Sequence, residues 1–301
     1  MWNMEIAALK AFLAVSAEAS FSRAAQRLFI TQPAVSKRIA SLEAELGVKL
    51  FDREGRKIRL TEAGLTLLPH AREIVHHADH TRELLSALSG HIGGVLKMAS
   101  SHHIGLHRLP AILKRYARRY PQVELDLRFL DSETASRQVE AGDLELALVT
   151  LPERLPATLT MEVIWHDPLR VVTAHDCRQD LETLLQTRAI LPPRNTWTRQ
   201  IIEHRFEEAG IEIRTLIETN NLETIRKMVE IGLGWSILPA TMLSPSLRAM
   251  PADTLELHRR LGIIHHHKRS IGNAAAAMIE LLKRKKGAEA PSIQQLNNDQ
   301  K

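Results

Sequence analysis

Residues 20–64 read SFSRAAQRLFITQPAVSKRIASLEAELGVKLFDREGRKIRLTEAG. Ser20 can cap a first short helix, because apolar side chains recur at helical spacing over residues 21–28. Thr31 offers a second N-cap, and Pro33 fits the first turn of the next helix, where its missing N–H leaves no hydrogen bond unmade. The stretch therefore predicts two short helices joined by a turn.

The second of these helices has two unlike faces. Its buried stripe consists of Val35, Ile39, Leu42 and Leu46. Its opposite side carries Gln32, Pro33, Ser36, Lys37 and Ala40, with no carboxylate among them. A Gln side chain can pair with adenine through two hydrogen bonds in the major groove, and Ser or Lys can reach base edges or phosphates. The pattern predicts a helix-turn-helix that binds double-stranded DNA.

A short basic hairpin is expected directly after this helix. Gly47 is placed to end the helix, residues 48–51 and 58–60 are expected as strands, and residues 52–57 form the turn. Arg53, Arg56 and Lys57 can then lie along phosphates or in the minor groove. Charge runs usually face solvent, but next to a helix-turn-helix a DNA-binding wing is the favoured interpretation.

From Ala24 to Gly64 the chain resembles, without a gap, the N-terminal signature of LysR-type transcriptional regulators, carried here by AAxxLxxTQPAVSxxIxxLExxLGxxLFxRxxRxxxLTxAG. The resemblance implies a winged helix-turn-helix, a long linker helix, and a C-terminal effector domain similar to periplasmic binding proteins. It also implies a homodimer or homotetramer that responds to a small-molecule effector. By position it assigns DNA contacts to Thr31, Gln32, Pro33, Ser36 and Arg38, with Arg53 and Arg56 in the wing.

The charge balance is mildly basic. Lys and Arg number 40 against 35 Asp and Glu, which gives a net charge of +5 and a pI near 9.5. The excess gathers in residues 1–60, as expected of a domain that binds phosphates. A single cysteine, Cys177, excludes an intramolecular disulfide. No apolar run reaches the length of a bilayer span and the N-terminus lacks signal-peptide features, so we expect a soluble, cytoplasmic protein with no membrane partner.

A long helix is expected from Thr61 to about Leu88. Two series of period seven run along it: Ala71, Ala78 and Leu85, and Leu67, Ile74, Thr81 and Leu88. Such a seam is narrow enough for a second helix, which favours self-dimerisation; packing on its own domain is the alternative. Pro69 is expected to bend the helix, and residues 86–94 are expected to form a hinge.

From Val95 strands and helices alternate, which favours an α/β fold with open, mostly parallel sheets. Strands are expected over residues 95–99, 123–130, 144–150, 169–174, 188–193, 215–219, 235–239 and 260–267. Helices are expected over residues 105–119, 132–141, 179–186, 197–209, 221–231 and 273–286. These strands and helices fall into two successive sets along the chain, which indicates two subdomains with a cleft between them.

The expected domain organisation has three parts and a tail. Residues 1–60 form the DNA-binding domain, 61–90 the dimerising linker and hinge, and 91–287 the effector-binding domain. The last divides into subdomain I (about 91–165 and 268–287) and subdomain II (about 166–267). Residues 288–301 have little apolar content and are expected to be disordered.

The cleft is the expected site of effector binding, since ligands of open α/β folds gather where strands end and helices begin. The candidate residues are Ser100, Ser101, His102, Thr150, Thr196, Trp197 and Asn220. Hydroxyls beside free helix N–H groups favour a small anion, such as a carboxylate, near Ser101 and His102, with Arg199 close by. The alternative is that Ser101, Thr196 and Asn220 only cap their helices.

Two other functions remain as alternatives. His76, His77 and His80, or His265, His266 and His267, could serve a metal- or pH-responsive regulator, but no CxxC or HExxH motif accompanies them, and no metal site is predicted. A soluble small-molecule-binding or enzymatic α/β protein is disfavoured because GxSxG, P-loop and dinucleotide motifs are absent. We expect no enzyme activity and no cofactor beyond a co-inducer, and RNA polymerase as a partner during activation. Effector, operator and sign of regulation are not predicted.

Overall fold

The computed structural model describes residues 4–54, 57–87, 92–252 and 255–286. The chain divides into two compact units, one formed by residues 1–91 with Ala141–Asp143, the other by Ile92–Glu140 and Leu144–Lys301. None of the described helices combines the length and apolar composition needed to cross a membrane. The expected tail 288–301 and the centre of the expected hinge, residues 88–91, lie outside the described residues.

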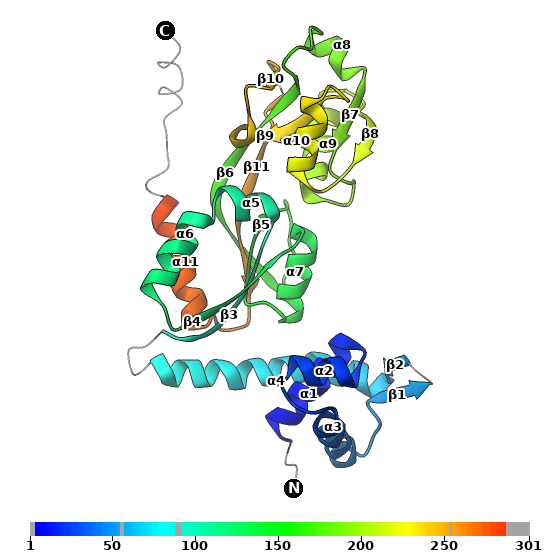
Figure 1. The fold of residues 1–301 in the computed structure, drawn as a ribbon, viewed down its shortest axis with the longest axis vertical. Helices are drawn as coiled ribbons and strands as arrows, with labels where there is room; N and C mark the ends of the chain where they lie inside the picture. Colours follow the sequence, from blue (N-terminus) through cyan, green and yellow to red (C-terminus); the bar gives the residue numbers. More distant parts are fainter. Residues whose placement is uncertain (1–3, 55–56, 88–91, 253–254, 287–301) are drawn as a thin grey trace. The chain divides into compact units, whose positions relative to one another are not determined.

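Three short helices open the first unit (Figure 1): α1 (Ile6–Glu18), α2 (Phe21–Arg27) and α3 (Gln32–Leu46). The predicted caps are confirmed, because Ser20 accepts a hydrogen bond from the Arg23 N–H and Thr31 accepts one from the Ala34 N–H. Gly47 ends α3 at φ 70°, a left-handed conformation that favours glycine. The stripe of Val35, Ile39 and Leu42 is buried against α1, so the helix-turn-helix has a core of its own.

The hairpin consists of β1 (Phe51–Glu54) and β2 (Lys57–Leu60), which pair antiparallel from Phe51–Leu60 to Glu54–Lys57. The predicted six-residue turn is therefore wrong: ladder pairing continues to Glu54 and Lys57 and leaves only residues 55–56 between the strands. Buried Glu43 of α3 joins the helix to the hairpin, since its carboxylate accepts hydrogen bonds from the Leu50 N–H (2.9 Å) and the Lys49 Nζ (3.0 Å). Burial opposes ionisation, but these bonds lower the pKa of Glu43 overall.

The long helix α4 (Glu62–Ala87) continues through Pro69. Its first half packs on its own domain: Ala71 is fully buried, and Leu67 and Ile74 pack against the same core. Lys10 Nζ of α1 also lies 2.7 Å from an Asp79 carboxylate oxygen. Ala71 therefore cannot belong to a dimer seam, whereas Leu85, 64% exposed, remains available.

The second unit begins with a sheet between two layers of helices (Figure 1). Its parallel strands are β3 (Gly94–Ser100), β4 (Val123–Phe129) and β5 (Leu146–Thr150), with β3 between the other two. The helices are α5 (His102–His107), α6 (Pro110–Arg119), α7 (Ser132–Ala141) and α11 (Asn273–Lys286). Side chains along β3 point alternately to the two helix layers: Leu96 and Met98 face α6 and α11, while Ala99 faces α7. The single helix predicted over 105–119 is two helices, because Pro110 starts a new one.

Two long strands connect the subdomains, β6 (Leu159–Ala174) and β11 (His258–His266), and they pair antiparallel. The prediction of mostly parallel sheets is therefore wrong, since β6 and β11 pair antiparallel with each neighbour in the sheet. Leu261 to His265 pair with β5, so this segment belongs to the first subdomain and not to the second, where the sequence boundary puts it. A Cβ at Gly262 would meet the Glu162 carbonyl oxygen at 2.1 Å, so this crossing needs glycine.

The second subdomain is smaller. Its strands are β7 (Arg188–Leu191), β8 (Arg214–Glu218), β9 (Ser236–Pro239) and β10 (Leu247–Ala249). Its helices are α8 (Leu181–Leu185), α9 (Trp197–Glu208), α10 (Leu222–Glu230) and the 3₁₀ turn η1 (Ala240–Met242). Buried Trp235 stacks on Phe206, with ring centroids 6.0 Å apart. The sequence prediction missed β10 and residues 159–168 of β6, since an edge strand and a hinge strand both depend on distant partners.

Candidate functional site

The exposed face of α3 is the candidate DNA interface. Gln32 lies at its N-terminal end, and the Gln32 amide donates a hydrogen bond of 3.1 Å to the Ser36 hydroxyl one turn later. The two polar side chains are thus held together on one face. Because a side chain that is already oriented loses less conformational entropy on binding, this pair is suited to read a base edge.

The other predicted DNA contacts surround this pair. Pro33 and Lys37 are exposed, Arg38 is half-buried, and Thr31 caps the helix. Arg53 lies on β1 opposite Ile58, and Arg56 lies outside the described residues. The structure brings Thr31, Gln32, Pro33, Ser36 and Lys37 to one end of α3.

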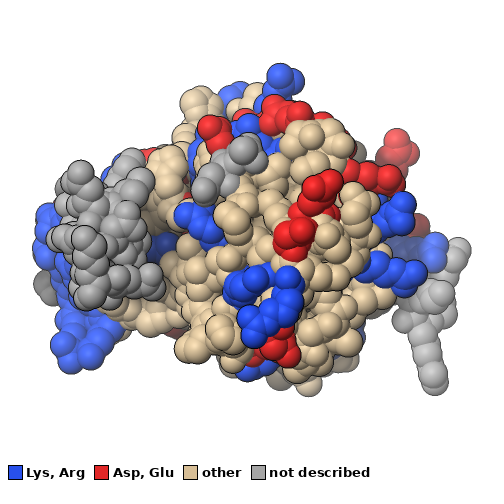
Figure 2. Space-filling model, turned by 90° about the horizontal axis from the view of Figure 1, so that it is seen from above, with Lys and Arg blue, Asp and Glu red and all other residues tan. Residues whose placement is uncertain are grey.

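The face of the molecule drawn in Figure 2 has a mixed charge. Basic and acidic side chains both occur over it. With a net charge of only +5, attraction to nucleic acid must come from local groups and not from the molecule as a whole.

A polar cavity of about 50 Å³ lies between the two subdomains of the second unit. Both subdomains line it: Ser101 opens α5 in the first, and Thr196 precedes α9 in the second. Space of this size holds a few water-sized groups. The cavity can therefore enclose the polar head of a small molecule, but not a large ligand.

Five predicted effector residues line this cavity: Ser101, His102, Thr150, Thr196 and Asn220. Ser101 occupies the N-cap position of α5 without making a side-chain cap hydrogen bond, so its hydroxyl is not used as a cap. Thr196 is a cap, since its hydroxyl accepts from the Arg199 N–H and donates to the Pro193 carbonyl. Asn221, and not Asn220, caps α10.

Two predicted residues do not line the cavity. Ser100 is fully buried at the end of β3, where its hydroxyl donates to the Ser101 carbonyl, because strand alternation turns it away. Trp197 contributes only its backbone nearby: its N–H donates to a Glu133 carboxylate oxygen at 2.5 Å, and its ring packs in the apolar cluster beneath α7. Ser100 and Trp197 are corrections to the predicted site.

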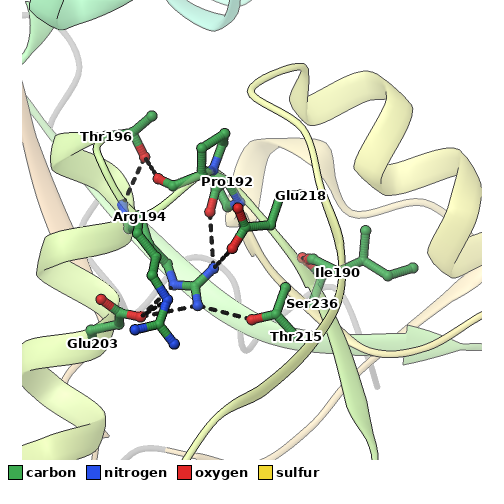
Figure 3. Close-up of polar contacts among 10 residues, drawn as sticks. Ile190, Pro192, Arg194, Thr196, Glu203, Thr215, Glu218 and Ser236 are labelled. Carbon is green, nitrogen blue, oxygen red and sulfur yellow. Dashed lines mark hydrogen bonds and ion pairs between the residues drawn. The ribbon is translucent and has the colours of Figure 1, made fainter.

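Arg199, expected near the ligand, is occupied elsewhere. Its buried guanidinium donates to the Glu203 carboxylate, the Pro192 carbonyl and the Thr215 hydroxyl at 2.8 to 3.0 Å. Figure 3 shows these partners around one guanidinium, with Glu218 completing the group. Arg199 therefore holds α9 to β7 and β8, and is not free for a ligand.

The cation that does line the cavity is Arg259 of β11, which the sequence analysis missed. Only 4% of it is exposed. Its Nε donates to Asp167 at 2.9 Å and its Nη1 to Thr198 at 3.0 Å, while Nη2 is buried and has no hydrogen-bond partner. Arg259 precedes the strand expected over residues 260–267, and nothing in that pattern indicates a ligand site. The cavity forms only when β11 and α9 come together in the folded chain.

His103 lines the same cavity as a neutral ring. It lies 3.7 Å from Asp167, which would favour a charged histidine, but burial together with Arg259, His107 and Arg108 lowers the pKa of His103 to about 2. Asp167 already pairs with two arginines, so we assign the neutral form. Neither ring nitrogen of His103 has a hydrogen-bond partner.

Two carboxylates, Asp131 and Glu133, also line the cavity. Asp131 accepts the Thr134 N–H at 2.7 Å at the start of α7, and Glu133 follows in the first turn. Burial, followed by the nearby charge of Asp131, raises the pKa of Glu133. The sequence could have indicated Asp131 as a site residue, because Asp131 follows a strand and precedes a helix, as Ser101 does.

An apolar pocket of about 290 Å³ adjoins the cavity and shares His102, His103 and Leu222 with it. Phe129, Leu106 and Met242 supply its other apolar walls. The His102 ring stacks on Phe129, with centroids 5.8 Å apart. Together the two spaces offer a small polar compartment and a larger apolar one.

The clustered histidines are not among the residues that line this cavity. His76 and His77 are on α4, and His265 and His266 are at the end of β11; the His80 side chain is outside the described atoms. Within the described residues, no three His, Cys, Asp or Glu side chains converge in the manner of metal ligands.

Two family models match the chain. Residues 6–65 match the bacterial regulatory helix-turn-helix protein model of the lysR family, and residues 89–287 match the LysR substrate binding domain. The first match lies in the first unit of the structure, and the second spans nearly all of the described part of the second unit.

Relatives and solved structures of similar proteins extend over most of the chain. A "Probable RuBisCO transcriptional regulator" of Synechocystis is 30% identical over 287 residues, covering 90% of this chain and 83% of that protein. A full-length OxyR variant of Pseudomonas aeruginosa has a TM-score of 0.73 at 24% identity, covering 93% of this chain and 98% of that one. Full-length CbnR in complex with its target DNA has a TM-score of 0.62 at 23% identity, covering 93% and 99%.

Proposed function

Because this chain belongs to the LysR family of transcriptional regulators and is not an enzyme, we propose that it binds a specific double-stranded DNA site and alters transcription when a small molecule carrying an anionic group enters the polar cavity. The observation that carries the proposal is the pairing of a pre-oriented base-reading face on α3 with a cavity lined by uncommitted polar groups in the other unit. We place its action in the cytoplasm.

Gln32 is the proposed base reader. Its amide can make two hydrogen bonds to adenine in the major groove, with Ser36 holding it in place. Thr31, Pro33, Lys37 and Arg38 contact the backbone beside it, and Arg53 and Arg56 of the wing contact phosphates or the minor groove. The four cations among them, Lys37, Arg38, Arg53 and Arg56, supply affinity that depends on salt but not on sequence.

Ser101, His102, Thr150, Thr196 and Asn220 are the proposed effector contacts, joined by Arg259. Groups from both subdomains meet at one cavity, so a ligand there changes the free energy of closing them. The ligand can shift the regulator only through its different affinities for the two arrangements.

The proposal also includes an assembly. Two chains form a homodimer through the second half of α4, and two dimers form a homotetramer through their effector domains. Two helix-turn-helix units then reach half-sites one helical turn apart, or a multiple of it. A change between effector domains alters the angle between dimers and thus the bend of the DNA. In activation, the rearranged complex contacts RNA polymerase.

Footprinting of the full chain on DNA fragments that it selects from random sequence tests the proposal. We expect two protected half-sites, and a footprint that changes when one metabolite from a thermal-shift screen is added. Equal binding to selected and random DNA would contradict the base-reading role of α3. A footprint that no bound metabolite alters would contradict the regulatory role of the cavity.

A further inference from the structure

We propose that the effector carries a carboxylate and an ammonium group a few ångströms apart, attached to an apolar side chain: it is an apolar α-amino acid. This inference rests on the proposed role of the cavity and adds to it. The prediction of a simple anion did not include the two carboxylates, Asp131 and Glu133, that line the same cavity as Arg259.

The cationic end of the cavity is built for an acceptor. Arg259 is 4% exposed, its Nε and Nη1 are satisfied by Asp167 and Thr198, and its Nη2 donor is left over. A buried donor without an acceptor is unfavourable, so a ligand oxygen at this position removes a cost that is already present. Arg108 also approaches Asp167, at 3.5 Å, so the cluster keeps a positive excess while His103 is neutral. A ligand carboxylate fits this charge.

The acidic end is built for a cation. Asp131 and Glu133 line the same cavity from the start of α7. Each accepts a backbone hydrogen bond, Asp131 from the Thr134 N–H and Glu133 from the Trp197 N–H, and a carboxylate has acceptor capacity for several more. Two close carboxylates repel each other, and the raised pKa of Glu133 reflects burial first and this repulsion second. An ammonium with three donors relieves the repulsion, and no third acidic or histidine ligand completes a metal site among the described residues.

The sizes of the two spaces set the rest of the ligand. The cavity of about 50 Å³ accepts the charged head, and the apolar pocket of about 290 Å³ accepts a side chain along Phe129, Leu106 and Met242. A ligand without an apolar part would leave the larger pocket unused. A ligand without a carboxylate would leave Arg259 uncompensated, and one without an ammonium group would leave Asp131 and Glu133 uncompensated. The three requirements together describe an apolar α-amino acid.

Calorimetric titration of the full chain with L-phenylalanine, L-leucine and L-methionine tests this directly. Matched analogues of phenylalanine remove one feature at a time: 3-phenylpropanoate lacks the ammonium, phenethylamine lacks the carboxylate, and glycine lacks the side chain. Since each charged group forms charge-assisted hydrogen bonds and the side chain buries apolar surface, we expect each analogue to bind roughly tenfold to a hundredfold more weakly than phenylalanine. This series needs no mutation and so does not depend on any variant folding.

Variants then assign the two ends. Glu133→Gln should remove the preference for phenylalanine over 3-phenylpropanoate, whereas Glu140→Gln, later on α7 and bonded to Thr158 outside the cavity, should keep it. Arg259→Lys keeps a positive charge, but its single ammonium nitrogen cannot occupy the Nε position beside Asp167 and the Nη2 position at the same time. It should weaken binding of the amino acid without altering that of phenethylamine. Arg178→Lys, on an exposed loop, is its control.

The outcomes separate this inference from the proposed function. If 3-phenylpropanoate binds the wild-type chain as tightly as the amino acids, the ammonium subsite is overturned while an anionic effector stands. If phenethylamine does so, the carboxylate subsite is overturned. If no amino acid binds but another metabolite changes the footprint, the amino-acid inference fails and the proposed function stands. If no small molecule changes the footprint, both fail.

Discussion

Gln32 and Lys37 share the exposed side of α3 but have different expected roles in DNA binding. Gln32→Ala should cost about 1–3 kcal/mol at the selected site and weaken discrimination at one base pair, because a bidentate contact to adenine is lost. Lys37→Ala should weaken selected and random DNA alike and lower the slope of log affinity against log salt by about one. Fluorescence anisotropy at several salt concentrations measures both. Equal losses on both DNAs for Gln32→Ala would remove it from base reading.

Ser101 and Thr196 both precede helices and both line the cavity, but only Thr196 acts as a cap. Ser101→Ala should therefore leave the melting temperature unchanged and reduce affinity for the bound amino acid by about 1.5–3 kcal/mol, the value of a hydrogen bond to a charged group. Thr196→Ala should lower the free energy of unfolding by about 0.5–2 kcal/mol. Calorimetry and thermal unfolding of both variants measure these effects. Unchanged affinity in Ser101→Ala would place the ligand elsewhere.

His103 should make the second unit sensitive to acid. Its folded-state pKa is about 2, below the ordinary value of 6.5, so between these values the unfolded chain binds a proton that the folded chain does not. Stability is therefore fully present above pH 6.5 and falls with decreasing pH, by about 1.4 kcal/mol per unit well below 6.5. Urea unfolding followed by tryptophan fluorescence from about pH 7 to 5 measures the slope, since Trp165, Trp197 and Trp235 all lie in this unit. His103→Gln should flatten the slope, and the exposed control His166→Gln should not.

At the scale of elements, the two halves of α4 differ in burial. Its first half is committed to the core of its own domain through Ala71, and its second half carries Leu85 on the surface. Leu85→Glu should convert a tetramer to a dimer, because it places like charges across the proposed seam, and burying an unpaired ion costs several kcal/mol. Analytical ultracentrifugation of the full chain measures the mass. Leu65→Glu, on an equally exposed leucine (59%) nearly opposite around the helix, should leave the mass unchanged.

The helix-turn-helix and the wing were predictable as elements because their signals are local. Ser20, Thr31 and Gly47 act within a few residues of their own position, and the structure confirms all three. The sheet of the second unit was less predictable. The pairing of β11 with β5 and β6 joins residues about a hundred positions apart, and no periodicity within β11 specifies that it runs antiparallel to both.

At the scale of the whole molecule, effector and DNA should influence each other's binding equally. If a ligand changes the affinity for the selected DNA by a given factor, that DNA must change the affinity for the ligand by the same factor, typically about 5- to 150-fold. Titrations of the full chain with each partner, in the presence and absence of the other, measure both factors. Unequal factors would mean that the measured DNA and ligand bind different assemblies of the chain.

The sequence by itself indicated the family through the signature from Ala24 to Gly64. It determined the helix-turn-helix with its wing and the two-subdomain α/β architecture, because capping, helical periodicity and turn chemistry act over short distances. It also placed Ser101, His102, Thr150, Thr196 and Asn220 at strand and helix ends that converge. Only the tertiary structure decided that Ser100 and Trp197 turn away, that Arg199 is held in its own network, and that Arg259 lines one cavity with Asp131 and Glu133. Arg259 comes from β11, whereas Asp131 and Glu133 come from the start of α7, far away in the chain. Whether a buried charge is satisfied or left free depends on every group packed around it.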